Sequence, residues 1–219
     1  MGSKALTSSP SILGVILAGG QARRLGGGDK ALHEVAGKTL LAHAIGRLQP
    51  QVSCVVINAN CDASRFADFS LPVVADTVGG FAGPLAGVLA GLDWAAECAP
   101  ECDWVVTVAT DAPFFPDDLV VRLLAAVHLE NADLVCAESG GRVHPVFGLW
   151  PVSLRNDLRS ALVDEEIRKV DLWTARHRLA VISFPVSVID PFFNINRPED
   201  IRAASKIFSR LKAKNGYET

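Results

Sequence analysis

Short apolar runs alternate with amphipathic segments along the first 130 residues of the chain. The apolar runs predict buried strands over residues 13–17, 52–58, 73–75 and 104–109. Between them, apolar residues recur every three or four positions and predict helices over residues 39–48, 84–96 and 116–129. We expect Asp117 and Asp118 to lie in the first turn of the last of these, where acids favour the helix dipole. The alternation predicts a three-layer α/β/α fold with a mostly parallel central sheet.

The later part of the chain is less regular. It predicts strands over residues 134–138 and 145–150, the second compatible with antiparallel pairing, and another within residues 179–188. Helices are predicted over residues 153–163, 169–176 and 198–211. We expect residues 1–11 to form a flexible N-terminal segment, residues 12–211 a single domain, and residues 212–219 a frayed C-terminus.

Composition narrows the class of protein. Apolar residues make up 49% of the chain and charged residues 21%, which is ordinary for a globular protein. The net charge of −3 gives no sign of a nucleic-acid or membrane surface, and no apolar stretch approaches the ~18 residues needed to span a bilayer. The five cysteines are irregularly spaced, as is typical of free thiols in a reducing compartment, and no secretory leader is visible. We therefore expect a cytoplasmic protein without nucleic-acid or membrane partners.

A glycine-rich basic loop, LAGGQARRLGGGDK, follows the first predicted strand. Its five glycines allow backbone N–H groups to approach an anion, and Arg23, Arg24 and Lys30 can neutralise phosphate. Lys30 follows Asp29 rather than glycine, so the loop is not a P-loop, and the dinucleotide-binding glycine fingerprint is absent from it as well. The loop lies at the strand end where such sheets bind ligands. It predicts a polyphosphate site, with a basic surface turn as the alternative.

Two further groups of polar residues are candidates for chemistry. Asp111 follows the predicted strand over residues 104–109, so its carboxylate can hold Mg²⁺ at the ligand edge of the sheet, or it can cap the following helix. Asn194 and Asn196 are two positions apart, so in an extended segment both side chains face the same side. Asx turns before Pro198 are the alternative for these two asparagines.

Several blocks of the chain occur in the order found in a known family. They are Leu17-Ala18-Gly19-Gly20, Arg23-Arg24-Leu25-Gly26, Asp29-Lys30, Val55-Val56-Ile57-Asn58-Ala59-Asn60, Asp76, Gly83-Pro84-Leu85-Ala86-Gly87, Thr110-Asp111-Ala112-Pro113, His144-Pro145 and Asn194-Ile195-Asn196-Arg197-Pro198. This combination, across roughly residues 12–205, resembles the nucleotidyltransferases of the nucleotide-sugar-transferase fold, and among them the molybdenum cofactor guanylyltransferases. Arg197 departs from the usual threonine beside the expected pocket for the second substrate.

The resemblance implies a Rossmann-like nucleotidyltransferase fold and transfer of GMP from GTP to molybdopterin, with release of pyrophosphate. Lys30, Asp111 and Arg24 would be the catalytic residues, Asp111 would hold Mg²⁺, and Asn194 and Asn196 would bind the pterin. The residues implied in GTP binding are Leu17, Ala18, Gly19, Gly20, Lys30, Asn58, Asp76 and Asp111. Molybdoenzymes or their chaperones are the implied recipients of the product.

Two other functions remain open from the sequence. One is a cytidylyltransferase for the same pterin, or a nucleotidyltransferase acting on a sugar or polyol phosphate. The other is a non-catalytic protein that binds nucleotide on a retained fold. The joint presence of Lys30 and Asp111 disfavours the non-catalytic reading, and Gly20 favours GTP over CTP because the cytosine-using relatives more often carry Leu-Ala-Ala-Gly.

Overall fold

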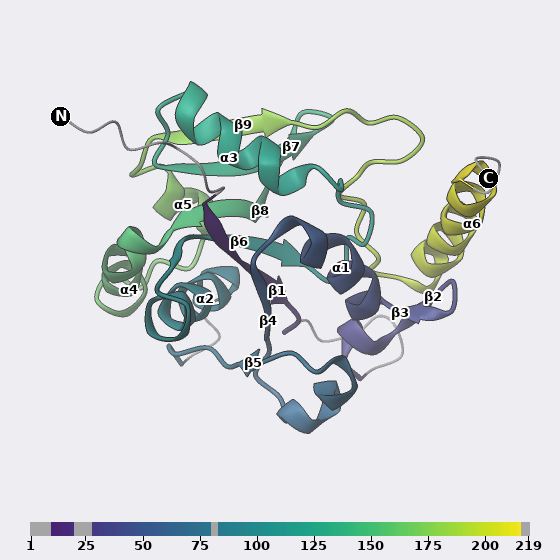
Figure 1. The fold of residues 1–219 in the computed structure, drawn as a ribbon, viewed down its shortest axis with the longest axis horizontal. Coiled ribbons are helices and arrows are strands. Elements are labelled where there is room, and N and C mark those ends of the chain that lie inside the picture. The colour runs from purple at the N-terminus through teal and green to yellow at the C-terminus, as the bar shows by residue number, and fades with distance from the viewer. Residues whose placement is uncertain (1–9, 20–27, 80–82, 216–219) are drawn as a thin grey trace, which may run out of the picture.

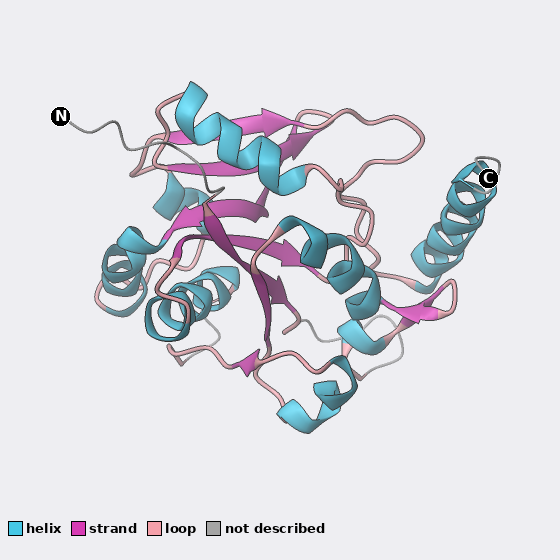
Figure 2. Cartoon of the chain, in the orientation of Figure 1, coloured by secondary structure: helices cyan, strands magenta, loops and turns pink. Residues whose placement is uncertain are grey.

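The computed structural model describes residues 10–19, 28–79 and 83–215, with side chains described as far as Arg210. A seven-stranded sheet forms the centre, with helices on both of its faces (Figure 1, Figure 2). Its strands are β1 Ser11–Leu17, β4 Cys54–Asn58, β5 Val73–Val74, β6 Cys102–Ala109, β7 Leu134–Ser139, β8 Arg142–Pro151 and β9 Leu179–Ser183. The helices are α1 Leu40–Leu48, α2 Pro84–Cys98, α3 Leu119–Leu129, α4 Arg155–Val163, α5 Val170–Thr174 and α6 Pro198–Asn215.

The strand order is β5-β4-β1-β6-β8-β7-β9. The pairs β1–β4, β1–β6, β4–β5 and β7–β9 are parallel, whereas β8 runs antiparallel to both of its neighbours. After β1 the chain builds outward through β4 and β5 and then returns to place β6 on the other side of β1. The carboxyl ends of β4, β1 and β6 therefore lie side by side at a topological switch point, where sheets of this kind bind ligands.

Alternating residues of the central strands pack into two apolar layers. Ile12 and Ile16 of β1 face a cluster completed by α1 and α3, and Leu13 and Val15 face a cluster completed by α2, α4 and α5. Both faces of β1 are buried, which explains why its sequence is a continuous apolar run rather than an alternating one. The expected three-layer α/β/α fold is confirmed.

Most elements expected from the apolar pattern are present within a few residues of their predicted ends. The prediction that Asp117 and Asp118 lie in the first turn of a helix is wrong, because α3 begins at Leu119 and both acids precede it. A small hairpin, β2 Glu34–Val35 and β3 Lys38–Thr39, was not expected. Its turn residues Ala36 and Gly37 both have positive φ, of 51° and 79°, as a tight hairpin turn requires.

Four short 3-10 helices complete the described elements: η1 Lys30–Leu32, η2 Gln49–Gln51, η3 Ala63–Phe69 and η4 Val152–Leu154. The sequence pattern predicts none of the four as a separate element, although η4 overlaps the start of the helix expected over residues 153–163. Helix α6 continues to Asn215, past the end expected at residue 211.

A third apolar cluster lies at one end of the molecule, where α6 packs near the β2–β3 hairpin (Figure 1). It joins Val35 of the hairpin and Leu40 of α1 to Phe114, Ile195 and Ala204, and all five side chains are buried. This cluster brings together three stretches that are far apart in the sequence: residues 35–40, residue 114 and residues 195–204.

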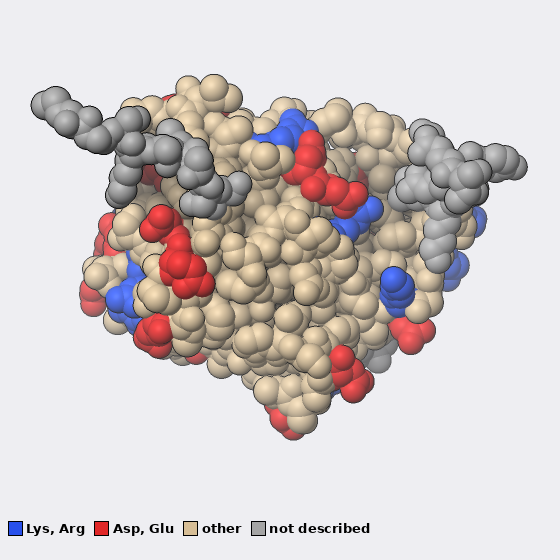
Figure 3. Space-filling view, in the orientation of Figure 1, with Lys and Arg blue, Asp and Glu red and all other residues tan. Residues whose placement is uncertain are grey.

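Charged side chains of both signs lie next to each other on the face seen in Figure 3, around a broad uncharged centre. A search of the helices in the described ranges found none able to span a lipid bilayer.

Candidate active site

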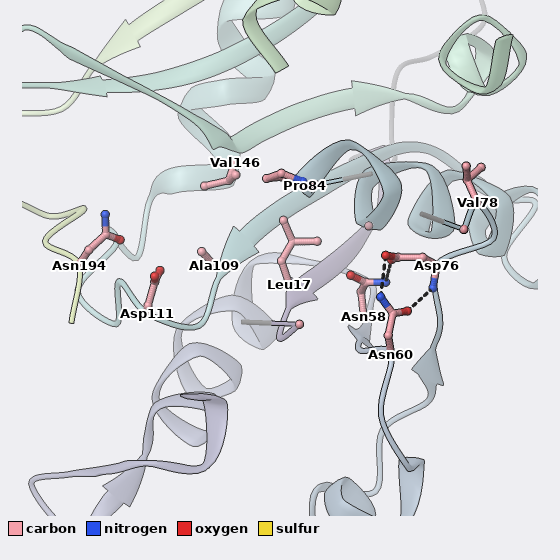
Figure 4. A pocket seen from close by; sticks show the side chains of 14 residues that line it. Leu17, Asn58, Asn60, Asp76, Val78, Pro84, Ala109, Asp111, Val146 and Asn194 are labelled. Carbon is pink, nitrogen blue, oxygen red and sulfur yellow. Dashed lines mark hydrogen bonds between the residues drawn. The ribbon is translucent and has the colours of Figure 1, made fainter. Parts of the chain in front are cut away.

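A cavity of about 660 Å³ opens at the carboxyl ends of β1, β4 and β6. Its walls come from the strand ends, from the loop after β5 and from the N-terminal turn of α2. The described residues that line it are Leu17, Gly19, Asn58, Asn60, Asp76, Val78, Gly79, Gly83, Pro84, Gly87, Ala109, Asp111, Val146 and Asn194. Figure 4 shows Asn58, Asn60 and Asp76 clustered at one end, Asp111 and Asn194 at the other, and Leu17 between them.

The end of the cavity that holds Asp76 is a network of amides around one carboxylate (Figure 4). Asn58 donates its Nδ2 hydrogens to Asp76 Oδ1 at 2.9 Å and to the Val74 carbonyl at 3.2 Å. Asn60 donates from Nδ2 to Asp76 Oδ2 at 2.7 Å, and its Oδ1 accepts from the Asp76 backbone N–H at 2.8 Å. Each carboxylate oxygen keeps a second acceptor position, so Asp76 is held in place and still able to accept hydrogen bonds from a ligand.

Helix α2 approaches this network closely at Gly87. A Cβ atom at that position would lie 2.4 Å from Asn58 Oδ1 and 2.7 Å from Leu17 Cδ2. Real Cβ atoms do not approach neighbours this closely, so the absence of a side chain lets α2 form the cavity wall. Glycine within a helix destabilises it by about 0.5–1 kcal/mol relative to alanine. At position 87 glycine is required in spite of this cost, because α2 packs tightly against Asn58 and Leu17.

The opposite end of the cavity is organised by a buried ammonium group. Lys30 Nζ donates to Asp111 Oδ2 at 2.7 Å and to Asn196 Oδ1 at 2.5 Å. Lys30 is only 8% exposed, and burying its charge costs hydration free energy. The two contacts offset that cost. An ammonium has three N–H donors, which leaves one for a ligand. Within the described residues, Asp111 Oδ1 accepts no hydrogen bond and is open to a ligand.

Backbone and ion-pair contacts fix these three groups relative to one another. The Ile195 N–H donates to the Asp111 carbonyl at 2.7 Å, which ties the asparagine segment to the end of β6. Asp29 accepts from Arg65 at 2.8 Å and thereby anchors the residue next to Lys30 to η3. The lysine, the carboxylate and the amide thus come from three separate segments and meet at one point.

The structure brings together most of the residues expected at the site. Leu17, Gly19, Asn58, Asp76, Asp111 and Asn194 line the cavity. Lys30 lies directly behind this lining, paired with Asp111, and Asn196 accepts from Lys30. Ala18 lies behind the wall, because it is buried in the core and its N–H donates to the Asn58 carbonyl at 2.9 Å. Gly20 and Arg24 fall outside the described residues.

Eight of the lining residues were missed as site residues from the sequence, and two of them, Asn60 and Gly87, shape the Asp76 end and stand in the blocks that carry the resemblance. Asn60 follows Asn58 by two positions, and this spacing at the end of a strand was the available signal. Gly87 lies inside a predicted helix, where a glycine is unfavourable unless another group approaches closely.

His144 belongs to a separate buried network near the loop that carries Asn194. Its Nε2 lies 2.8 Å from Ser139 Oγ, and Ser139 donates to Asp190 Oδ1 at 2.7 Å. Burial lowers the pKa of His144 below its usual 6.5, opposed by the nearby Asp190 carboxylate. His144 therefore supports the fold beneath the asparagine segment and does not line the cavity.

The fold and the cavity are those of a nucleotidyltransferase, and comparison with known proteins agrees. The family described as MobA-like NTP transferase domain matches residues 14–178. A molybdenum cofactor guanylyltransferase from Bradyrhizobium sp. is 55% identical over 201 residues, which cover 92% of this chain and 95% of that protein. One from Rhodopseudomonas palustris is 53% identical over 205 residues, covering 94% and 98%. The chain belongs to the molybdenum cofactor guanylyltransferase family.

A solved structure shows the same fold at lower sequence identity. The molybdopterin-guanine dinucleotide biosynthesis protein A from Archaeoglobus fulgidus superposes with a TM-score of 0.68 and is 23% identical. The superposition covers 90% of this chain and 99% of that one, so the overall fold is shared across nearly the whole length.

Proposed function

We propose that this protein transfers GMP from GTP to molybdopterin in a Mg²⁺-dependent reaction, forming a guanine dinucleotide cofactor and pyrophosphate. The observation that carries the proposal is the meeting of Lys30, Asp111 and Asn196 at one end of a cavity whose other end presents Asp76. The names of the similar proteins agree with this reaction. The cytoplasmic location expected from cysteine usage stays a prediction.

The Asp76 end of the cavity suits guanine. Guanine presents two adjacent donor groups, N1–H and N2–H₂, and a carboxylate with free acceptor positions can receive both. Cytosine presents an acceptor at N3 beside its single amino group, so the same carboxylate would repel it. Both N–H groups of Asn58 are used by Val74 and Asp76, which leaves Asn58 mainly the task of holding the carboxylate.

The Lys30 end suits the phosphates. In the proposed reaction a phosphate oxygen of molybdopterin attacks the α-phosphorus of GTP, a new P–O bond forms, and the bond to the bridging oxygen of pyrophosphate breaks. Negative charge accumulates on the transferred group and the leaving group, and catalysis of this kind depends on positioning and on fixed positive charge. The remaining donor of Lys30 can supply that charge from a buried position, where it is weakly screened.

The residues at this end also fit Mg²⁺. Magnesium prefers oxygen ligands, commonly one or two carboxylates together with substrate phosphates and water. Asp111 offers Oδ1, and the side chain of Asn194 faces the same cavity. No three His, Cys, Asp or Glu side chains in the described ranges come together as a metal site. Bound there, Mg²⁺ would neutralise charge on the phosphate oxygens.

A nucleotide-selectivity assay with purified molybdopterin tests the proposal. We expect pyrophosphate release from GTP that requires both Mg²⁺ and the pterin, with little release from CTP. The Asp111→Asn variant keeps a side chain of the same shape, so it should fold, with a lower thermal midpoint because the buried Lys30 loses its ion pair, and it should lose at least about a hundredfold in turnover. Asp117→Asn, at an exposed acid that precedes α3, is the matched control and should turn over normally.

The alternatives give different results in the same assay. Equal turnover with CTP would point to a nucleotidyltransferase of different base preference. Binding of GTP without pyrophosphate release at any pterin concentration would indicate a non-catalytic nucleotide-binding protein. Full turnover by Asp111→Asn would remove Asp111 from the catalytic machinery.

A further inference from the structure

Helix α2 carries one buried acid among otherwise apolar buried residues. Asp93 is 6% exposed, and its buried neighbours on the same helix are leucine, valine, alanine and glycine. Arg159 of α4 donates to both oxygens of Asp93, at 2.7 Å and 2.6 Å. Thr77, in the loop after β5, donates its hydroxyl to Asp93 Oδ2 at 2.8 Å. One carboxylate therefore connects α2, α4 and the loop that follows the edge strand.

Stability alone does not account for a charge at this position. The Asp93 carboxylate is taken out of water while the Arg159 side chain stays 41% exposed, so burial costs the carboxylate hydration that a partly screened partner offsets only in part. Apolar residues of the same size often stabilise such a position as well or better. The neighbouring positions of α2 show that the helix packs well with apolar side chains. What an apolar residue at position 93 cannot do is accept the hydrogen bond of Thr77.

The loop that Thr77 belongs to forms one wall of the cavity. We use the name base-side loop for residues 76–79, of which Asp76, Val78 and Gly79 line the cavity. The loop leaves β5, a strand of only two residues at the edge of the sheet, so it receives little support from the ladder. Its polar ties come from both sides: Asn60 holds Asp76 and Asp93 holds Thr77.

We propose that Asp93, oriented by Arg159, is a positioning residue that fixes the base-side loop through Thr77 and thereby sets affinity for the guanine base. The proposal rests on the proposed function, in which Asp76 receives the base. Asp93 does not line the cavity, so its effect is indirect: it holds the segment in which Asp76 and Thr77 are adjacent. Loss of the tie should weaken nucleotide binding without changing the chemistry at Lys30.

Thr77→Val removes the hydroxyl while keeping the shape of the side chain. We expect GTP affinity, measured by titration without the pterin, to fall about five- to tenfold, a part of the full effect of losing one hydrogen bond to a charged group, because the lost bond lies within the protein and acts on GTP only through the loop. The turnover number at saturating GTP should stay within about twofold of the wild type. The preference for GTP over ITP, which lacks the 2-amino group, should shrink because Asp76 is less well placed. Thr77→Ser keeps the hydroxyl and should restore wild-type affinity.

A matched control separates positioning from general destabilisation. Thr174→Val removes another hydroxyl, one that is 2% exposed and donates to the Asp171 carbonyl in α5. It should lower the thermal midpoint without changing GTP affinity. If Thr77 acts through Asp93, the two changes remove the same contact. The double variant Thr77→Val with Asp93→Asn should then bind GTP no more weakly than whichever single variant has the lower GTP affinity.

Three outcomes would overturn the proposal. One is wild-type GTP affinity in Thr77→Val, another is an equal loss of affinity in Thr174→Val, and the third is full additivity in the double variant. Each of these leaves the proposed function standing, because the wild type still binds and turns over GTP. A wild type that fails to bind GTP would overturn both.

Discussion

One methyl group added at Gly87 should weaken GTP binding out of proportion to its effect on the fold. The new Cβ would lie 2.4 Å from Asn58 Oδ1, so either α2 must withdraw or the amide must rotate. Rotation would break the hydrogen bonds of Asn58 to Val74 and Asp76. Withdrawal would move the cavity wall itself. Both responses displace the residues proposed to receive the base.

The size of the effect follows from opposing contributions. Alanine is favoured over glycine within a helix by about 0.5–1 kcal/mol, whereas overpacking a tight site costs about 1–3 kcal/mol. The strained or broken hydrogen bonds of Asn58 add about 0.5–1.5 kcal/mol each. We expect a net loss of about 1–5 kcal/mol in unfolding free energy, which lowers the thermal midpoint by about 2–20 °C in a chain of this size. GTP affinity should fall by about tenfold or more, since each 1.4 kcal/mol is about a factor of ten.

Two other helical glycines provide matched controls. At Gly91 a Cβ would meet Val15 Cγ2 at 2.6 Å, deep in the core and away from the cavity, so Gly91→Ala should lower the thermal midpoint and leave the GTP dissociation constant unchanged. Gly46 in α1 has no atom within 4 Å of the added Cβ, so Gly46→Ala should raise the midpoint by about 1–4 °C. Thermal melts and GTP titrations on the three variants separate strain from site geometry.

The reasoning would be refuted if Gly87→Ala bound GTP within about twofold of the wild type while losing as much stability as Gly91→Ala. That result would mean that the Asn58 amide can give way without moving Asp76. An equal loss of GTP affinity in Gly91→Ala would refute it too, because binding would then follow stability alone.

Two further predictions concern the charged end of the cavity and the buried histidine. Lys30→Gln removes the ammonium that holds Asp111, so turnover should fall at least about a hundredfold. Lys38→Gln, at an exposed lysine, is the control and should turn over normally. An equal loss of turnover in both variants would contradict the role of Lys30. The folded protein resists protonation of His144, whose pKa burial lowers, so stability should be unaffected above about pH 6.5 and fall as the pH drops below it. In thermal melts between about pH 7.5 and pH 5.5, the thermal midpoint should fall less in His144→Gln than in the wild type. The midpoint of the control His128→Gln, changed at an exposed residue, should fall as much as that of the wild type. Equal falls in all three proteins would contradict this prediction.

The fold could be predicted from the sequence because buried strands and amphipathic helices differ in apolar period. The positions of Asp76 and Asp111 at strand ends followed from the same pattern, since carboxyl ends of parallel strands share one edge. Contacts that depend on side chains from remote segments had no such signal. The hydrogen bond of Lys30 to Asn196, across 166 positions, and the connection of Asp93 to Thr77 are of this kind.

Local elements without a long pattern were missed for a related reason. The β2–β3 hairpin has two residues in each strand, too few to show alternation. The predicted start of α3 is three residues early. Aspartates are common both in the first turn of a helix and at the position just before it, so Asp117 and Asp118 do not distinguish the two starts. The spacing of Asn60 from Asn58 was a weak signal, because polar residues are common after strands. The role of Asn60 depends on its hydrogen bonds to Asp76, which the sequence pattern does not predict.

The two ends of the cavity are built from different parts of the sequence, and the third apolar cluster joins those parts. The walls around Asp76 are complete once α2 has been made. Asn194 and Asn196 come after residue 178, where the match to the MobA-like NTP transferase domain ends, and they flank Ile195, which packs in one cluster with Phe114 and α6. Under the proposed function, a chimaera that exchanges only the segment after β9 between two relatives would inherit nucleotide preference from one parent and contacts to the second substrate from the other. Such a graft should keep the residues that join this segment to the rest of the chain, which are Ile195, packed in the cluster with Phe114 and hydrogen-bonded to the Asp111 carbonyl, and Asn196, which accepts from Lys30.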